Sequence, residues 1–174
     1  HFPVGHTNTV KIHNVNPAFS YKSARFLRQK QTVPVFLYAE KNDKYGYIRI
    51  EKFAETTYAE MLIALARLHQ ENCEGVVIDL RGNTGGYLEV AFQMVNEFLP
   101  KDKLIVYTEG RKFPRKNYFS NGTGSSQQMP IIVLLDEWSA SASEIFAGAI
   151  QDNDRGTVIG RRSFGKGLVQ QPIE

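Results

Sequence analysis

The sequence predicts an α/β domain in which parallel strands alternate with helices. Short runs rich in β-branched residues occur at 75–80 (GVVIDL), 131–135 (IIVLL) and 156–160 (GTVIG), and such runs are typical of strands buried in a parallel sheet. Segments whose apolar residues repeat at helical spacing separate these runs. Alternation of this kind predicts right-handed crossovers between neighbouring strands.

Residues 1–32 are polar and only weakly periodic, so we expect an N-terminal arm or linker remnant there, with a short strand at 10–12. The remainder, 33–174, is expected to form the core. A strand over 33–40 and a second over 45–50 are joined by a polar turn, which predicts a β-hairpin.

Three helices and one further strand complete the expected order. A capping-box pattern starts a helix over 57–70, and apolar spacing predicts a second over 88–98 and a third over 141–152. A strand is expected at 104–108. The glycine- and serine-rich stretch at 110–129 is expected to be an exposed or poorly ordered loop.

Composition bounds the possible functions. The chain has 174 residues, 42% of them hydrophobic, which fits one domain with a real core. Cys73 is the only cysteine, which excludes an intrachain disulfide and a cysteine metal cluster. No apolar run approaches the ~20 residues of a membrane span.

The net charge of +3 is too mild to indicate a nucleic-acid partner. One short segment is nevertheless basic and aromatic together, and we interpret it as a solvated loop rather than a nucleic-acid patch. Its basic residues are Arg111, Lys112, Arg115 and Lys116, and its aromatic residues are Phe113, Tyr118 and Phe119.

Ser141 and Lys166 are the residues that most suggest chemistry. Ser141 lies at a predicted helix start just past a buried strand, where free N–H groups favour negative charge. Lys166 follows twenty-five residues later between two glycines. A serine becomes a good nucleophile when a base removes its proton, and a desolvated lysine can be that base. The pair suggests a serine–lysine hydrolase, although Ser141 and Glu144 also fit a simple capping box.

The turn at 82–86 (GNTGG) follows a buried strand and opens a helix, so its N–H groups should converge. It could be an oxyanion hole, a tight structural turn or a phosphate-binding turn, but the spacing G-x-G-x-x-G is absent. Residues 160–166 match most of the P-loop motif, but position 167 is Gly where the motif requires Ser or Thr. An NTPase is therefore disfavoured.

A Ser-His-Asp triad is also disfavoured. His1, His6 and His13 fall in the N-terminal arm and His69 ends a helix, and none has metal-ligand spacing. Asp152 shares a helix with Ser141, but eleven residues of rise place it about 16 Å away. We therefore expect Asp152 to close the helix end or pair with Arg155, not to orient the serine.

Taken together, three stretches make the chain resemble the carboxy-terminal processing (tail-specific) peptidases, a serine–lysine family. They are GYIRIEKF (46–53), GVVIDLRGNTGG (75–86) and SASASEIFAGAIQDNDRGTVIGRRSFGKGLVQQ (139–171). The resemblance implies a crotonase-like (ClpP/crotonase) ββα superhelix as the protease core.

Carried over by position, the family's site falls on residues of this chain as follows. Ser141 is the nucleophile, Lys166 the general base and Gln170 the residue that orients the lysine. Asp152 supports the site. The oxyanion hole is formed by N–H groups of Gly85 or Gly86 and of Ala142.

The resemblance also implies a function and a setting. It implies endopeptidase action on unstructured C-terminal tails of polypeptides, in the periplasm or cell envelope, without a cofactor or metal, and it leaves the oligomeric state open. Thr84 replaces the family's usual proline. No PDZ-like domain is recognisable and further core strands are expected after residue 174, so we expect weak activity from this chain alone.

Two alternatives remain open. One is a non-catalytic module that binds apolar ligands or peptides on the same scaffold. The other is a crotonase-type acyl-CoA enzyme, which would normally use carboxylates in place of a serine–lysine pair.

Overall fold

A computed structural model describes residues 35–39, 44–111 and 113–168 of the chain. The expected arm over 1–32 and the candidate residue Gln170 lie outside the described residues, so the predictions made for them stay predictions.

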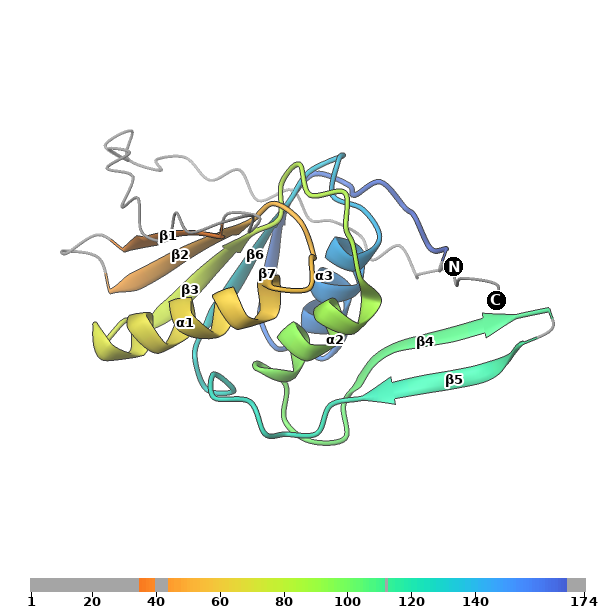
Figure 1. The fold of residues 1–174 in the computed structure, drawn as a ribbon, viewed down its shortest axis with the longest axis horizontal. Helices are drawn as coiled ribbons and strands as arrows, with labels where there is room; N and C mark the ends of the chain where they lie inside the picture. The colour runs from red at the N-terminus through yellow and green to blue at the C-terminus, as the bar shows by residue number, and fades with distance from the viewer. Residues whose placement is uncertain (1–34, 40–43, 112, 169–174) are drawn as a thin grey trace.

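Five strands form one sheet in the order β1-β2-β3-β6-β7 (Figure 1). β1 and β2 make the predicted antiparallel hairpin, and β2, β3, β6 and β7 are parallel. The strand bounds are Val35–Ala39 for β1, Tyr45–Ile50 for β2, Gly75–Asp79 for β3, Ile131–Leu135 for β6 and Thr157–Gly160 for β7. The predicted α/β class is confirmed.

Three helices connect the parallel strands: α1 (Thr57–Gln70), α2 (Leu88–Asn96) and α3 (Ala142–Asp152). The sheet grows in one direction from β2 to β7, so right-handed crossovers place all three helices on one face (Figure 1). α2 packs against both α1 and α3. Side chains directed to the other face, such as Val77 and Ile132, keep partial exposure.

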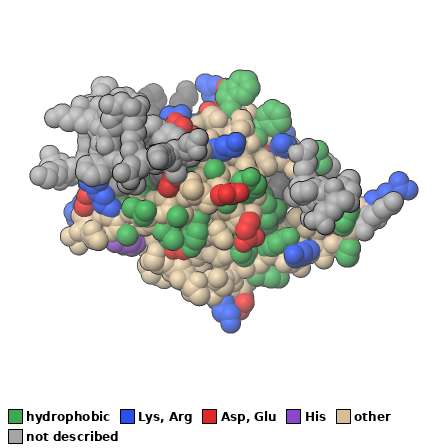
Figure 2. All heavy atoms as spheres, viewed as in Figure 1, with side chains coloured by type: hydrophobic (Ala, Val, Ile, Leu, Met, Phe, Trp, Pro, Cys, Tyr) green, Lys and Arg blue, Asp and Glu red, His purple; other side chains and the backbone are tan. Residues whose placement is uncertain are grey.

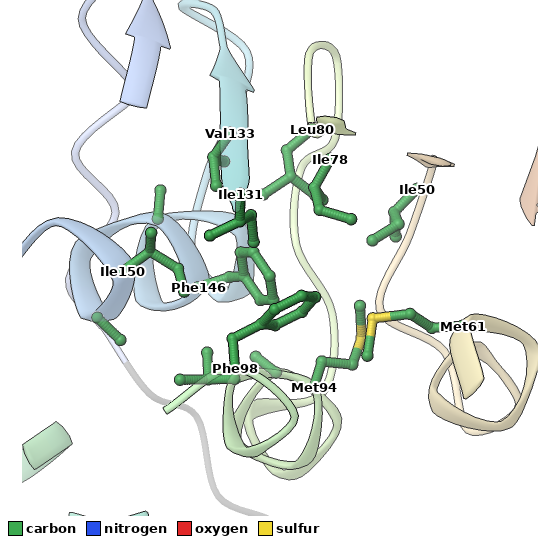
Figure 3. Close-up of a cluster of buried hydrophobic side chains, with 14 of the residues drawn as sticks. Ile50, Met61, Ile78, Leu80, Met94, Phe98, Ile131, Val133, Phe146 and Ile150 are labelled. Atoms are coloured by element: carbon green, nitrogen blue, oxygen red, sulfur yellow. The ribbon is translucent and has the colours of Figure 1, made fainter. Parts of the chain in front are cut away.

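The core lies between this sheet and the helices. Figure 3 shows side chains from β2, β3 and β6 meeting those of the helices and of the turn that follows α2. Phe98 and Phe146 pack edge to face with ring centroids 6.0 Å apart, an arrangement that aromatic rings prefer. This contact ties the end of α2 to α3 and so fixes the helix that begins at Ser141.

The expectation of a loop over 110–129 was wrong for residues 113–119. Residues Leu104–Gly110 (β4) and Phe113–Phe119 (β5) form an antiparallel hairpin that projects from the body of the molecule (Figure 1). Most β5 side chains are exposed, so the strand has no buried face to impose an alternating apolar pattern.

Within the described ranges, no helix is both long and apolar enough to cross a membrane.

Candidate active site

The turn after β3 is held by the side chain of Asn83. This residue is fully buried, and its amide nitrogen donates to the carbonyl of Ile50 at 2.7 Å while its amide oxygen accepts from the N–H of Gly85 at 2.8 Å. Its backbone carbonyl accepts from the Ala140 N–H and from the Ser143 hydroxyl, at 3.0 and 2.9 Å. Asn83 therefore ties the end of β2 and the start of α3 to one turn.

Both glycines of this turn are required by close approach. A Cβ at Gly85 would lie 2.8 Å from the Cβ of Ser141, and one at Gly86 would collide with the carbonyl of Phe53. Both residues also have positive φ, of 101° and 151°. The turn thus lies directly against Ser141, as the oxyanion-hole interpretation requires.

Two backbone N–H groups near Ser141 remain available. The N–H of Gly85 is engaged by Asn83, whereas those of Gly86 and Ala142 have no partner among the described residues. Ala142 is the first residue of α3, whose positive dipole end favours negative charge. These two donors are therefore the ones that could stabilise an oxyanion.

The three serines at the start of α3, Ser139, Ser141 and Ser143, have different environments. The hydroxyl of Ser139 donates to the carbonyl of Leu80 at 2.9 Å, and that of Ser143 donates to Asn83; both residues are fully buried. Ser141 is partly exposed, and its backbone has φ 56° and ψ −112°, a strained conformation for a residue other than glycine. Strain of this kind at a strand-to-helix turn is a feature of exposed nucleophiles.

Glu144 joins the segment of Ser141 to that of Lys166. One carboxylate oxygen accepts from the backbone N–H of Ser141 and from that of Lys166, each at 2.8 Å. The backbone nitrogens of Ser141 and Lys166 therefore lie no more than twice that distance apart. The other oxygen accepts from the Ser163 hydroxyl at 2.7 Å and the Gly165 N–H at 2.6 Å.

The Lys166 side chain is exposed, and its residue belongs to neither a helix nor a strand. The structure thus brings the backbone of Lys166 to Ser141 across twenty-five residues. The sequence identified Glu144 only as the partner in a capping box. Its second set of contacts, nineteen to twenty-two residues further along the chain, had no sequence signal.

Asp152 lies at the far end of α3 from Ser141, as the helix geometry predicted. Partial desolvation raises the pKa of its carboxyl group. The suggested pairing with Arg155 is not present: Arg155 donates to the carbonyls of Phe98, Ser126 and Met129. Those bonds fix the chain after α3 to the end of α2 and to the loop that precedes β6.

A buried carboxylate paired with an exposed arginine was not anticipated at the end of β3. Asp79 is completely buried, and Arg81 donates to its two oxygens at 2.9 and 2.8 Å. The hydroxyl of Tyr47 donates to the same carboxylate. Burial opposes ionisation of Asp79, but these hydrogen bonds outweigh it and lower its pKa. Burial, followed by the bond to Asp79, raises the pKa of Tyr47 to about 12.

In the described part of the chain, cysteine and histidine side chains do not assemble a competing nucleophile or metal site. A cleft of about 480 Å³ lined by His69, Cys73 and Glu74 lies at the amino ends of the parallel strands, opposite the edge that holds Ser141. Burial raises the pKa of the Cys73 thiol, which disfavours a thiolate nucleophile. No group of three or more His, Cys, Asp or Glu side chains could hold a metal there.

Comparison with known proteins agrees with this geometry. The sequence model of peptidase family S41 matches residues 44–174. The chain belongs to peptidase family S41. The resemblance seen in the sequence is confirmed, because S41 relatives carry the name of carboxy-terminal processing proteases.

Two such relatives are a carboxyl-terminal-processing protease of Synechocystis, 40% identical over 129 residues, and the carboxy-terminal processing protease CtpB of Bacillus subtilis, 42% identical over 128 residues. Each match covers 74% of this chain but only 30% and 26% of the relatives. The chain therefore spans less than a third of the length of these S41 proteins.

A solved S41-like structure supports the fold. The photosystem II D1 C-terminal processing protease superposes with a TM-score of 0.72 at 30% identity, and the match covers 82% of this chain and 40% of that one.

Proposed function

We propose that the protein is a serine endopeptidase in which Ser141 is the nucleophile and Lys166 the general base. One observation carries the proposal: a single Glu144 oxygen binds the backbone of both residues. Positioning two reacting groups in this way removes much of the entropic cost of bringing them together. S41 relatives named as proteases support the same assignment.

The proposed reaction proceeds through an acyl-enzyme. The step requires an unprotonated Lys166, and because the described chain leaves this side chain exposed, substrate or the rest of the polypeptide would have to desolvate it. The amine then takes the proton of the Ser141 hydroxyl while the oxygen attacks the peptide carbonyl, and the carbonyl π electrons move to the oxygen. The N–H groups of Gly86 and Ala142 stabilise that oxyanion. Lys166 then gives its proton to the leaving amine, and water hydrolyses the ester by the same route.

The other predicted residues take supporting roles in this proposal. Gln170 would orient the amine of Lys166. Gly85 provides the space in which the turn contacts Ser141, while its own N–H holds Asn83. Asp152 would support the fold of the far end of α3.

We propose unstructured polypeptide tails as substrates and a compartment outside the cytoplasm as the setting. Exposed aromatic side chains border the site and suit apolar substrate groups: Tyr87 follows Gly86, Trp138 precedes Ser139, and Phe164 donates its N–H to the Ser139 carbonyl at 3.0 Å. The alternative, a non-catalytic peptide-binding module, would have no need for the strained, partly exposed serine.

A serine-directed fluorophosphonate probe tests the assignment in the full-length protein. We expect labelling and cleavage of an unstructured polypeptide to disappear in Ser141→Ala and in Lys166→Arg, because arginine keeps its proton at working pH. Lys101→Arg, at an exposed lysine away from the site, is the matched control and should behave as wild type. Full labelling of Lys166→Arg would refute the serine–lysine mechanism. Peptide binding by the wild-type protein without turnover would favour the non-catalytic alternative.

A further inference from the structure

The β4–β5 hairpin presents an outer face of hydrophobic and polar side chains that nothing in the described chain covers. Its register pairs Leu104 with Phe119 and Tyr107 with Asn117, so these four side chains share one face. The opposite face is anchored: Val106 is buried and Tyr118 packs edge to face on Phe92. We define the outer face as Leu104, Tyr107, Arg115, Asn117 and Phe119.

The hydrophobic side chains of this hairpin are unusually exposed. Leu104, Tyr107 and Phe119 expose 36%, 43% and 50% of their surface, and Phe113 near the tip exposes 67%. A projecting hairpin has no structural need for aromatic side chains in water. They point instead to a partner that accepts aromatic groups.

Positive charge is concentrated on the same element. Residues 104–119 hold four basic residues and one acidic residue, so this short segment carries a net charge equal to the +3 of the whole chain. The Arg115 guanidinium lies 3.9 Å from the ring centroid of Tyr107, and the Lys116 ammonium lies 4.9 Å from that of Tyr118. Figure 2 shows basic and hydrophobic side chains together on the projecting part of the surface. The partner should therefore be anionic.

The hairpin is held rigidly at its base. The N–H of Lys103 donates to the Ser120 hydroxyl at 2.9 Å, and the N–H of Ser120 donates to the Lys103 carbonyl at 2.8 Å. β4 packs against α2 and α3. The tip is consequently presented at a fixed distance from the catalytic body, and little ordering is needed when it meets a partner.

We propose that this hairpin docks the protein on an anionic lipid bilayer. Aromatic side chains partition into the headgroup region, and nearby Lys and Arg side chains are attracted to acidic lipids. A second copy of the chain fits less well, because two copies of this basic hairpin would repel each other. Nucleic acid also fits less well, because Arg115 already occupies the Tyr107 ring face that a base would stack on.

Vesicle flotation of the full-length protein tests the proposal, since bilayer binding is independent of peptidase activity. We expect flotation with vesicles of mixed phosphatidylcholine and phosphatidylglycerol, loss at high salt, and none with phosphatidylcholine alone. Changing Arg111, Arg115 and Lys116 to Gln together should weaken partitioning about a hundredfold, at about fivefold per charge. Phe113→Ser with Phe119→Ser should also abolish flotation while keeping the circular dichroism of the wild type.

Matched controls change the same properties elsewhere. The combined Lys44→Gln, Lys52→Gln and Arg67→Gln variant lowers the net charge equally, and Ile63→Ser removes an exposed apolar side chain from α1. Both should float as wild type. The proposal is overturned if the wild-type protein stays in the bottom fraction of the gradient, or if the hairpin and control variants float alike. It is also overturned if the hairpin variants alter the oligomeric state, or if hydrogen exchange shows that the rest of the polypeptide covers the outer face.

Discussion

Replacing Glu144 by glutamine tests the link between the nucleophile and the base. The wild-type carboxylate accepts four hydrogen bonds, from the N–H groups of Ser141, Gly165 and Lys166 and from the Ser163 hydroxyl. The isosteric amide has one oxygen and one NH₂ group, so two of these donors lose their acceptor and face another donor. The segment that carries Lys166 should then detach from α3.

The size of the effect follows from the contacts. A hydrogen bond to a charged group contributes about 1.5–3 kcal/mol, but water can reach the exposed Gly165 and Lys166 and replace part of the loss. We therefore expect about 2–3 kcal/mol less stability for the docked segment. If the reaction requires that segment in place, the rate should fall about 30- to 150-fold.

The assay is the fluorophosphonate labelling rate of Ser141, with amide hydrogen exchange at Gly165 and Lys166. Both amides should exchange faster in the variant, and labelling should slow in parallel. Glu137→Gln is the control, because Glu137 makes only an exposed ion pair with Arg161 and such pairs contribute little. Unchanged labelling together with faster exchange would show that Glu144 holds the loop without serving the reaction.

Two further predictions concern the fold that supports the site. Gly86→Ala should destabilise the turn severely because its Cβ meets the Phe53 carbonyl, whereas Gly82→Ala, at φ 74° but with open space around it, should cost about 1 kcal/mol in urea unfolding. Asp79→Asn should lower the free energy of unfolding by about 1.5–3 kcal/mol, because the buried side chain loses its charge-assisted hydrogen bonds while the exposed Arg81 guanidinium stays hydrated. The folded-state pKa of Asp79 is lowered, so its contribution should be complete above about pH 4 and should be lost as pH falls further; an acid limb unchanged in Asp79→Asn would refute this.

The sequence predicted those elements whose pattern is local. The helix 57–70 and the strands 45–50 and 131–135 match their observed bounds, because apolar spacing specifies them within a few turns. The capping box predicted at Thr57 was wrong: Thr57 is the first helical residue, and its hydroxyl donates to the Lys52 carbonyl. β5 was missed because its pairing with β4 alone, away from the core, requires no alternation of buried and exposed residues.

The same distinction separates the predicted and missed parts of the site. Ser141, Lys166 and the glycine turn could be proposed as site residues because their residue types and spacing suggest chemistry. The contacts of Glu144 and the burial of Asp79 arise only when distant segments pack together. Asn83 belonged to the predicted turn, but its bond to Ile50 depends on where β2 ends in space.

The two ends of the β4–β5 hairpin meet through the paired bonds of Lys103 and Ser120. Residues 104–119 thus form a segment whose two ends are already held together by hydrogen bonds. A short turn or a longer hairpin could replace this segment without changing the distance that the chain must span between α2 and β6. If the hairpin docks the protein as proposed, such exchanges would change where S41 proteins bind while the proposed active site stays the same.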